Sequence, residues 1–316
     1  MAQGSFISER DLIKRVLAIL GGIVNDDCAV LDVGDRYLVA TTDMLHRKSD
    51  FPEVMTPWQI GWMTVAVNLS DVAAMGAEPS GVLIAAGIPQ GTALELVDGI
   101  FLGFRDCARA FMTRVLGGDM DSTEELNLTG FATGFVEKEL IIRRSGASPG
   151  DILCTTGSLG AAGAGLLQLQ RGEDRGTFVK NLLEPMPRIK EGRALALSRS
   201  VTAMMDNSDG LALSLSDLSE ASGVGFVLDE EAIPLAQGIE DAFGRTKGLE
   251  LAMSAGGDFE LVFTVKPSMM EAASEAVNLT TMGRVVEEGI WMETGGRKKR
   301  IKPRGYEHGL VAGPSS

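Results

Sequence analysis

The segment 56–76 constrains the fold most strongly, because it is long and apolar and carries a single charge. Thr56 is a suitable N-cap, Pro57 fits the first helical turn, and Gly76 follows the last apolar residue. The pattern predicts one helix that ends near Met75. Because a helix that is apolar on nearly all sides is normally buried, we expect this one to lie in the interior.

The single charge of this helix is Asp71. Its helical neighbours at three and four residues are apolar, except for Asn68. Burying an unpaired carboxylate is costly, and carboxylates that lose their water usually hold a cation. Two interpretations of Asp71 stay open, namely a capped or salt-bridged structural acid and a metal ligand.

Four short acidic clusters elsewhere lie next to a glycine or at the end of an apolar run. They are Asn25-Asp26-Asp27, Thr41-Thr42-Asp43, Gly117-Gly118-Asp119 and Asp206-Asn207-Ser208-Asp209-Gly210. We expect Asp43 and Asp119 to follow the ends of strands. Taken singly, each cluster could be a turn or a helix cap. Together, with no matching run of buried lysines, they predict a divalent-metal cradle that holds a polyphosphate.

The net charge excludes some functions. The chain has 316 residues, a formal net charge of −14 and a sequence pI near 4.7. A nucleic-acid-binding protein would normally present a basic face, so we expect no nucleic-acid partner. An anionic substrate suits such a protein if magnesium inverts the local charge. The sequence contains no GxxxxGK[ST] loop, no HExxH and no GxSxG, which disfavours P-loop kinases, zinc hydrolases and serine esterases.

The cysteines and the apolar runs predict where the protein resides. Cys28, Cys107 and Cys154 are scattered and form no CxxC pair, which favours a reducing, cytoplasmic compartment. Residues 1–20 form a charged amphipathic pattern rather than a signal peptide. No apolar run reaches membrane-spanning length, so we expect no membrane partner.

Strand and helix patterns alternate in both halves of the chain, which predicts an α/β or α+β fold with two lobes. The glycine- and proline-containing segment 145–151 is the best candidate for a boundary between them. We expect an N-terminal domain over residues 1–145, a C-terminal α/β domain over residues 146–310 and a disordered tail over residues 311–316.

The order of these motifs resembles one known family. The motifs are the four acidic clusters, the segment 66–77 around Asp71, the segment 144–151 and the ending Gly305-Tyr306-Glu307-His308. From about residue 20 to Tyr306 the chain resembles the thiamine-monophosphate kinases of the aminoimidazole-ribonucleotide-synthetase-like superfamily. The resemblance implies ATP-dependent phosphorylation of thiamine monophosphate to thiamine diphosphate. The transfer would be direct, in-line and magnesium-assisted, and it would need no general base.

The resemblance also implies roles for individual residues. Several magnesium ions would be held by Asp27, Thr41, Thr42, Asp43, Asp71, Asp119, Asp206 and Asp209. ATP would contact Gly118, Arg144 and Ser208, and the substrate would contact Asp50 and Tyr306, with Tyr306 against its thiamine end. The implied assembly is a homodimer in which the N-terminal domains bind ATP and metal. Their mixed sheets would meet in a barrel-like interface, and the C-terminal lobe would be an α/β sandwich.

Three positions depart from the family's pattern. Asn25 replaces a glycine, Asp50 replaces a histidine and Gly257 replaces a glutamate. The last two positions contact the substrate in the family, so the resemblance supports metal and ATP binding more directly than the identity of the acceptor. Two alternative functions stay open. One is another ATP-using enzyme of the superfamily, such as a ring-closing synthetase, and the other is a non-catalytic nucleotide- or metal-binding regulator.

Overall fold

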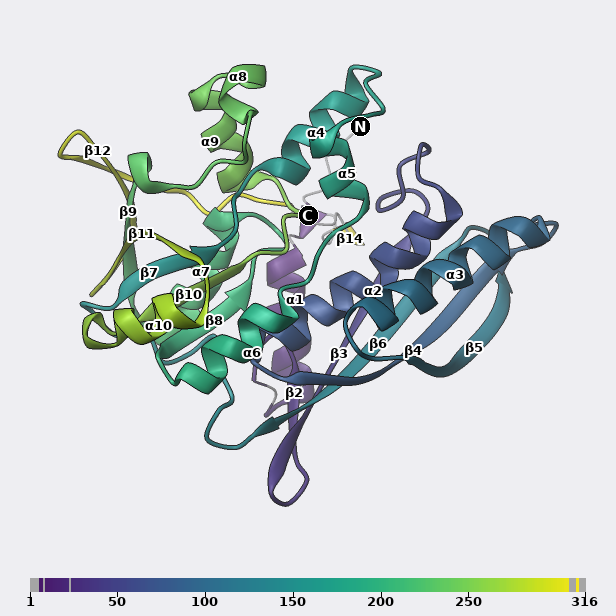
Figure 1. Cartoon of the computed structure of the whole chain (residues 1–316), viewed down its shortest axis with the longest axis horizontal. Coiled ribbons are helices and arrows are strands. Elements are labelled where there is room, and N and C mark those ends of the chain that lie inside the picture. The colour runs from purple at the N-terminus through teal and green to yellow at the C-terminus, as the bar shows by residue number, and fades with distance from the viewer. Residues whose placement is uncertain (1–5, 8, 23, 307–310, 313–316) are drawn as a thin grey trace.

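The computed structural model describes residues 6–7, 9–22, 24–306 and 311–312. The chain forms two lobes, each built on a mixed β-sheet, and helix α2 (Pro57–Ala74) lies where they meet (Figure 1). The predicted two-lobed α/β fold is confirmed. No described helix is long and apolar enough to cross a bilayer.

The N-terminal lobe is an open sheet of five strands in the order β2-β3-β6-β4-β5. The strands are β2 (Ala29–Asp32), β3 (Arg36–His46), β4 (Glu78–Pro89), β5 (Val115–Thr123) and β6 (Asn127–Glu137). Only β4 and β5 are parallel, because helix α3 (Leu94–Ala110) carries the chain back between them. Helices α2 and α3 cover one face of this sheet (Figure 1).

Helix α2 forms where the sequence predicts it. The backbone N–H of Gln59 donates to Thr56 Oγ1 at 3.2 Å, and the Gln59 side chain accepts from the Thr56 N–H at 3.0 Å, which closes a capping box. From Ile60 to Ala74 every residue is buried except Asp71, which is partly buried. The helix packs on the first sheet, on α3 and on the C-terminal lobe. Asp71 therefore lies at the junction of the two lobes.

The C-terminal lobe is a sheet of seven strands in the order β13-β12-β9-β11-β7-β10-β8. Its strands are β7 (Ile152–Thr156), β8 (Val201–Asp206), β9 (Gly225–Asp229), β10 (Leu261–Val265), β11 (Leu279–Val286), β12 (Ile290–Thr294) and β13 (Arg297–Arg300). Its helices are α4 (Ala161–Gln170), α5 (Thr177–Leu183), α6 (Ile189–Ser198), α7 (Leu211–Ser222), α8 (Ile239–Phe243), α9 (Arg245–Ser254) and α10 (Met270–Ala276), with short 3₁₀ turns at Glu230–Ala232 and Pro267–Met269. Strands β9 and β12 are parallel, and the other neighbouring pairs are antiparallel.

The first and last described strands pair with each other. Helix α1 (Glu9–Leu20) forms where the amphipathic pattern is, and β1 (Phe6–Ile7) pairs antiparallel with β14 (Val311–Ala312). The first two residues of the expected tail are thus a strand, and residues 313–316 lie outside the described residues. The domain boundary near residue 145 stays a prediction.

Two strands extend further than expected. Strand β3 is paired with β6 along its whole length to His46, so Asp43 lies inside the strand. Strand β5 runs to Thr123 beside β4, so Asp119 also lies inside a strand. The expectation that both aspartates follow strand ends is therefore wrong. Pairing with a long neighbouring strand outweighs the low strand propensity of glycine and aspartate.

Candidate metal and nucleotide site

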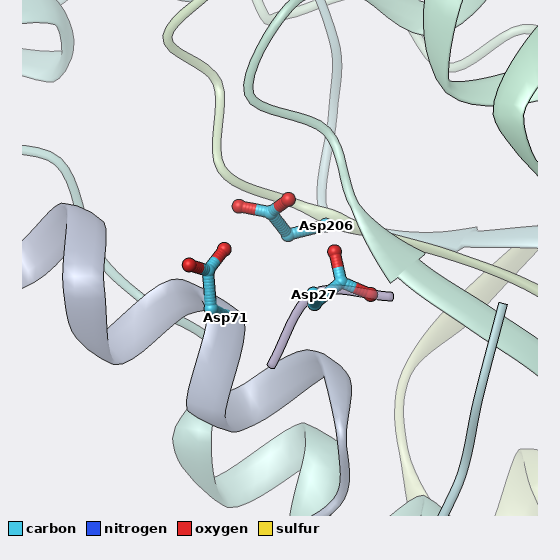
Figure 2. Close-up of side chains that lie close together, drawn as sticks. All are labelled: Asp27, Asp71 and Asp206. Atoms are coloured by element: carbon cyan, nitrogen blue, oxygen red, sulfur yellow. The ribbon is translucent and has the colours of Figure 1, made fainter. Parts of the chain in front are cut away.

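Three aspartates from different parts of the chain converge at the junction of the lobes. Asp27 lies in the bend before β2, Asp71 on α2 and Asp206 at the end of β8 (Figure 2). One carboxylate oxygen of each lies within 4.8 Å of the others. Asp27 and Asp206 are buried, with exposed fractions of 7 % and 2 %. This spacing allows one cation to contact all three.

Two hydroxyl groups orient two of these carboxylates. Thr41 Oγ1 donates to Asp71 Oδ2 at 2.5 Å, and Ser70 Oγ donates to Asp206 Oδ2 at 2.6 Å. Each hydrogen bond leaves the second oxygen of its carboxylate for another ligand. Ser70 was not among the predicted site residues, although it directly precedes Asp71 in the sequence.

Asp27 retains one unsatisfied oxygen. The Arg144 guanidinium donates to Asp27 Oδ1 at 2.8 Å, whereas Asp27 Oδ2 is buried and accepts no hydrogen bond from the described residues. A buried acceptor without a partner is costly. A buried oxygen in this condition, on a carboxylate that lies close to two others, fits a hard divalent cation such as magnesium.

The pKa values of the clustered carboxylates indicate that too little positive charge lies near them. Burial raises the pKa of Asp206 to about 8, and the nearby charge of Asp27 adds to this effect. Burial raises the pKa of Asp71 well above its usual range, and the nearby charges of Asp43 and Asp206 raise it further. Bound magnesium would favour the ionised form of all of these groups.

Arg144 provides one positive charge at this point. Burial lowers the pKa of its guanidinium, but the charges of Asp27, Asp217 and Asp206, with the hydrogen bond to Asp27, together outweigh burial and leave the pKa above its usual value. Its backbone N–H donates to Asp26 Oδ1 at 3.1 Å, and its buried Nε has no partner among the described residues. Arg144 therefore stays charged, with one N–H that can donate to a ligand.

Strand β3 divides its three predicted ligands between two faces. Side chains alternate along a strand, so Thr41 and Asp43 share the face toward α2, and Thr42 points outward. Burial raises the pKa of Asp43 to about 6, and its backbone N–H donates to Asn68 Oδ1 at 3.1 Å. Thr42 Oγ1 donates to Gly130 O at 2.8 Å, so this hydroxyl is used within the sheet.

Within one chain, Asp119 lies far from Asp27, Asp71 and Asp206. The strand register places it in a row with Met44, Thr129 and Ala85, on the face that points away from α2. Three strand spacings, about 14 Å, separate it from β3. Asp119 is exposed at the edge of the sheet.

Gly118 precedes Asp119 on the same edge strand. A Cβ atom at Gly118 would lie 1.8 Å from the carbonyl oxygen of Ile84, so only glycine fits beside β4. This close approach explains the glycine by packing, whether or not a phosphate lies nearby.

The loop after β8 carries Ser208 and Asp209. The Gly257 N–H donates to Ser208 O at 2.7 Å, and the Tyr306 N–H donates to Asp209 O at 3.1 Å, which fixes the loop from two sides. Burial raises the pKa of Asp209 to about 6. Gly257 has φ +100°, which favours glycine where the family has glutamate.

Asp50 and Tyr306 lie near each other. Asp50 Oδ2 accepts from the His46 N–H at 2.9 Å and from Ser49 Oγ at 2.7 Å, which closes a turn after β3. Burial raises the pKa of the Tyr306 hydroxyl, and the negative charge of Asp50 raises it further. The Tyr306 side chain is 43 % exposed.

A cavity of about 590 Å³ is lined by Arg144, which pairs with Asp27, and by Asp26 and Met205, which precede Asp27 and Asp206; the three clustered aspartates do not themselves line it. Its polar lining includes Asp26, Arg144, Ser208, Asp209 and Tyr306. Its apolar lining comes from α1, from the residues after it, from β8 and from α7, and includes Ile13, Leu17, Val24, Met205 and Leu213. Pockets for nucleotides and other small ligands have this size and this mixture of apolar walls with a few polar groups. Asp26 and the residues of α1 were not among the predicted site residues.

Known proteins match almost the whole chain. Residues 25–136 match the model of the AIR synthase related protein, N-terminal domain, and residues 148–290 match that of the AIR synthase related protein, C-terminal domain. The thiamine-monophosphate kinase of Methanospirillum hungatei is 40 % identical over 303 residues, which cover 96 % of this chain and 99 % of that protein. The chain belongs to the thiamine-monophosphate kinase family. The family member of Archaeoglobus fulgidus is 37 % identical over 311 residues, which cover 96 % of this chain and 98 % of that one.

Solved structures share the fold of this thiamine-monophosphate kinase family member. AaThiL complexed with AMPPCP and TMP has a TM-score of 0.87 and 28 % identity, covering 95 % of this chain and 97 % of that one. The E. coli hydrogenase maturation protein HypE has a TM-score of 0.70 at 20 % identity, covering 93 % and 97 %, and shares the fold alone. The family inferred from the motifs is therefore confirmed.

Proposed function

We propose that this chain transfers the terminal phosphoryl group of ATP to thiamine monophosphate, giving thiamine diphosphate. The observation that carries the proposal is the convergence of Asp27, Asp71 and Asp206 beside Arg144 and a cavity of nucleotide size, in a member of the thiamine-monophosphate kinase family. The complex of AaThiL with AMPPCP and TMP supports both the donor and the acceptor.

Magnesium bound by the clustered aspartates would neutralise the phosphates of donor and acceptor. Asp27, Asp71 and Asp206 would supply ligand oxygens, and Thr41 and Ser70 keep two of those carboxylates oriented. Asp43 and Asp209 would extend the set of acidic ligands, and Asp209 lines the cavity. The proposal also keeps Thr42 and Asp119 as ligands, both on the outward face of the sheet, Thr42 on the inner strand β3 and Asp119 on the edge strand β5.

The chain's own residues then position two anions for in-line transfer. Arg144 would donate from Nε to a phosphate oxygen of ATP, because that N–H is buried without a protein acceptor among the described residues. Ser208 and Gly118 would be further contacts of ATP. The attacking oxygen belongs to a phosphate that is already ionised at neutral pH, so no general base is needed. Catalysis would consist of orientation and charge stabilisation.

Asp50 and Tyr306 are the proposed contacts of the thiamine end. Thiamine carries a cationic thiazolium ring, and an aromatic face beside a carboxylate suits a cation. The Tyr306 ring is partly exposed at the cavity, and the charge of Asp50 acts on it. Aspartate in place of the family's histidine keeps a polar group near the ligand and adds a negative charge.

The assembly that we propose is a homodimer. The outward face of the N-terminal sheet carries Met44, Leu83 and Phe131, which are 59 %, 40 % and 37 % exposed. An exposed apolar sheet face of this kind usually marks an interaction site. The proposal also places the enzyme in the cytoplasm, which suits its three free, buried cysteines.

Product analysis tests the proposed function. Purified protein is incubated with ATP, magnesium and thiamine monophosphate, with unphosphorylated thiamine in a parallel reaction. We expect magnesium-dependent thiamine diphosphate from the monophosphate alone. Protein that binds ATP but yields no diphosphate would contradict the acceptor and favour another enzyme of the superfamily or a regulator.

A further inference from the structure

The turn formed by residues 256–260 holds the loop formed by residues 207–209, which carries Ser208 and Asp209. Three backbone hydrogen bonds join the turn to the loop, namely Gly257 N–H to Ser208 O at 2.7 Å, Phe259 N–H to Asn207 O at 3.1 Å and Asn207 N–H to Glu260 O at 2.7 Å. A Cβ atom on Gly256 would lie 2.5 Å from Ser208 O, so the turn packs directly on the loop. The position of the loop backbone therefore depends on the shape of the turn.

The backbone of this turn is strained at Phe259, which has φ +51°. A bulky residue at positive φ is an outlier, and it keeps this conformation only when its surroundings fix it. The Phe259 side chain packs against the hydrophobic core, which secures the ring rather than the backbone on either side of it. The two neighbouring residues, Asp258 and Glu260, are therefore the groups that can hold the turn in shape.

Asp258 fixes the turn on one side of Phe259. Its Oδ2 accepts from the Gly160 N–H at 2.6 Å, and its Oδ1 accepts from the Ala162 N–H at 3.0 Å. These N–H groups belong to the start of α4, where Gly160 occupies the N-cap position and has no side chain to accept them. Residues 161–165 of α4 are buried, so Asp258 is attached to a firmly packed end of that helix.

Glu260 fixes the turn on the other side. Its carboxylate accepts from Thr156 Oγ1 and from Arg188 Nε, each at 2.7 Å, and a second N–H of Arg188 donates to its other oxygen. Glu260 is only 4 % exposed. Because removing one partner of a buried ion pair strongly destabilises a protein, Asp258 is the better position for a test by substitution.

We infer that Asp258 is a positioning residue for the donor and metal end of the site. It holds the strained turn, and the turn holds the loop that places Ser208 and Asp209 in the lining of the cavity. The inference rests on the proposed function, which assigns Ser208 to ATP and Asp209 to magnesium. Asp258 does not itself line the cavity, so it acts on the bound donor through the backbone of the loop.

Asp258→Asn tests this role, with Asp229→Asn as the matched control. In Asp258→Asn one carboxylate oxygen becomes an amide nitrogen, which cannot accept the second N–H. Asp229 also caps a helical turn, because its Oδ1 accepts from the Glu231 N–H at 3.0 Å. Asp229 is exposed at the end of β9, with three strands between β9 and β8. Both variants thus weaken a cap, and only Asp258→Asn loosens the turn beside Ser208.

Two measurements show whether the loop loses its position. Hydrogen exchange followed by mass spectrometry should show several-fold faster exchange of the amides of residues 207–212 in nucleotide-free Asp258→Asn protein. Calorimetry with the magnesium complex of AMPPCP should show about tenfold weaker binding, the scale on which loss of an outer partner weakens a metal site. Asp229→Asn should change neither quantity. Unchanged exchange or unchanged AMPPCP affinity in Asp258→Asn would overturn the inference.

Phe259→Gly separates positioning from a general loss of stability. Glycine removes the strain at this position and also removes the packing of the ring, so the Tm should fall. Combined with Asp258→Asn, it should nevertheless restore most of the AMPPCP affinity, because an unstrained turn depends less on its anchor. Tm and affinity would then change in opposite directions. An affinity that stays low or falls further in the double variant would show that Asp258 contributes stability alone.

The binding measurements are independent of turnover, so the inference and the proposed function can fail separately. If the wild type makes no thiamine diphosphate and AMPPCP affinity still falls in Asp258→Asn but not in Asp229→Asn, the proposed acceptor is rejected and the inference stands. If the wild type makes the product and Asp258→Asn binds AMPPCP with undiminished affinity, the function stands and the inference is rejected. A wild type that binds no AMPPCP would reject both.

Discussion

The hydroxyl of Ser70 donates a 2.6 Å hydrogen bond to Asp206, and this bond joins helix α2 of the N-terminal lobe to strand β8 of the C-terminal lobe. The next residue, Asp71, accepts from Thr41 of strand β3. Two consecutive positions of one helix thus orient two carboxylates from different lobes. The geometry of the candidate metal site is therefore linked to the docking of the lobes. That docking is reinforced at the start of α2, where Trp62 Nε1 donates to Pro185 O at 2.8 Å.

Ser70→Ala removes this link, and we expect a higher magnesium requirement for turnover together with a modest loss of stability. When bound magnesium keeps Asp206 ionised, a hydrogen bond to this charged group contributes about 1.5–3 kcal/mol. Magnesium titration of activity and urea unfolding measure the two effects. Ser198→Ala is the control, because it removes a 2.6 Å hydroxyl contact with Ser200 at the end of α6. Equal magnesium requirements in both variants would contradict a role of Ser70 at the metal site.

Asp71→Asn should reduce turnover by at least about 100-fold, the scale observed when a charge-stabilising group is lost from an active site. The metal-free variant should be as stable as the wild type or more so, because asparagine removes a carboxyl whose ionisation is disfavoured by burial and by neighbouring carboxylates. Kinetics with magnesium and thermal unfolding with EDTA test the two parts. Asp98→Asn, an exposed position on α3, should change neither. Wild-type turnover in folded Asp71→Asn protein would exclude the proposed metal site.

The secondary-structure elements could be predicted because they depend on local sequence pattern. The acidic residues of the site could be predicted because burying a charge is costly. Helix α2 shows the first of these, since its caps and its apolar surface follow from residues that are adjacent in the sequence. Asp27, Asp71 and Asp206 share one anomaly, a carboxylate beside apolar or glycine-rich sequence, and the three do lie together.

Strand register and long-range packing could not be predicted in the same way. Asp43 and Asp119 lie inside strands because β3 and β5 have long partners, and the pleat then sends their side chains to opposite faces. The bond between Ser70 and Asp206 spans 136 residues. The amphipathic pattern of residues 1–20 gives the helix but not the cavity that one of its faces lines.

Without metal, the stability of the protein should fall as pH rises from about 4 to about 8. Burial raises the pKa of Asp206 to about 8 and those of Asp43 and Asp209 to about 6, above the ordinary 3.8. The unfolded chain releases these protons first, so over this range it binds fewer protons than the folded chain, and stability decreases with pH. Saturating magnesium should reverse the trend, because metal binding requires ionised carboxylates and releases their protons. Thermal unfolding at pH 5 and pH 8, with EDTA or with magnesium, measures both effects. A magnesium-induced rise in Tm that is no larger at pH 8 than at pH 5 would contradict the linkage.

Phe131→Asp should convert the proposed dimer to a monomer. Phe131 lies beside Thr42 and Leu83 on the outward face of the N-terminal sheet, where a carboxylate would have to be buried in a dimer interface without a partner. Sedimentation at several protein concentrations gives the oligomeric state, and circular dichroism checks that the sheet persists. Leu197→Asp is the control, since Leu197 is 57 % exposed on α6, outside this face. A wild-type protein that sediments as a monomer would reject the proposed dimer outright. A dimer that survives Phe131→Asp would place the interface on another surface and leave the apolar sheet face without an assigned role.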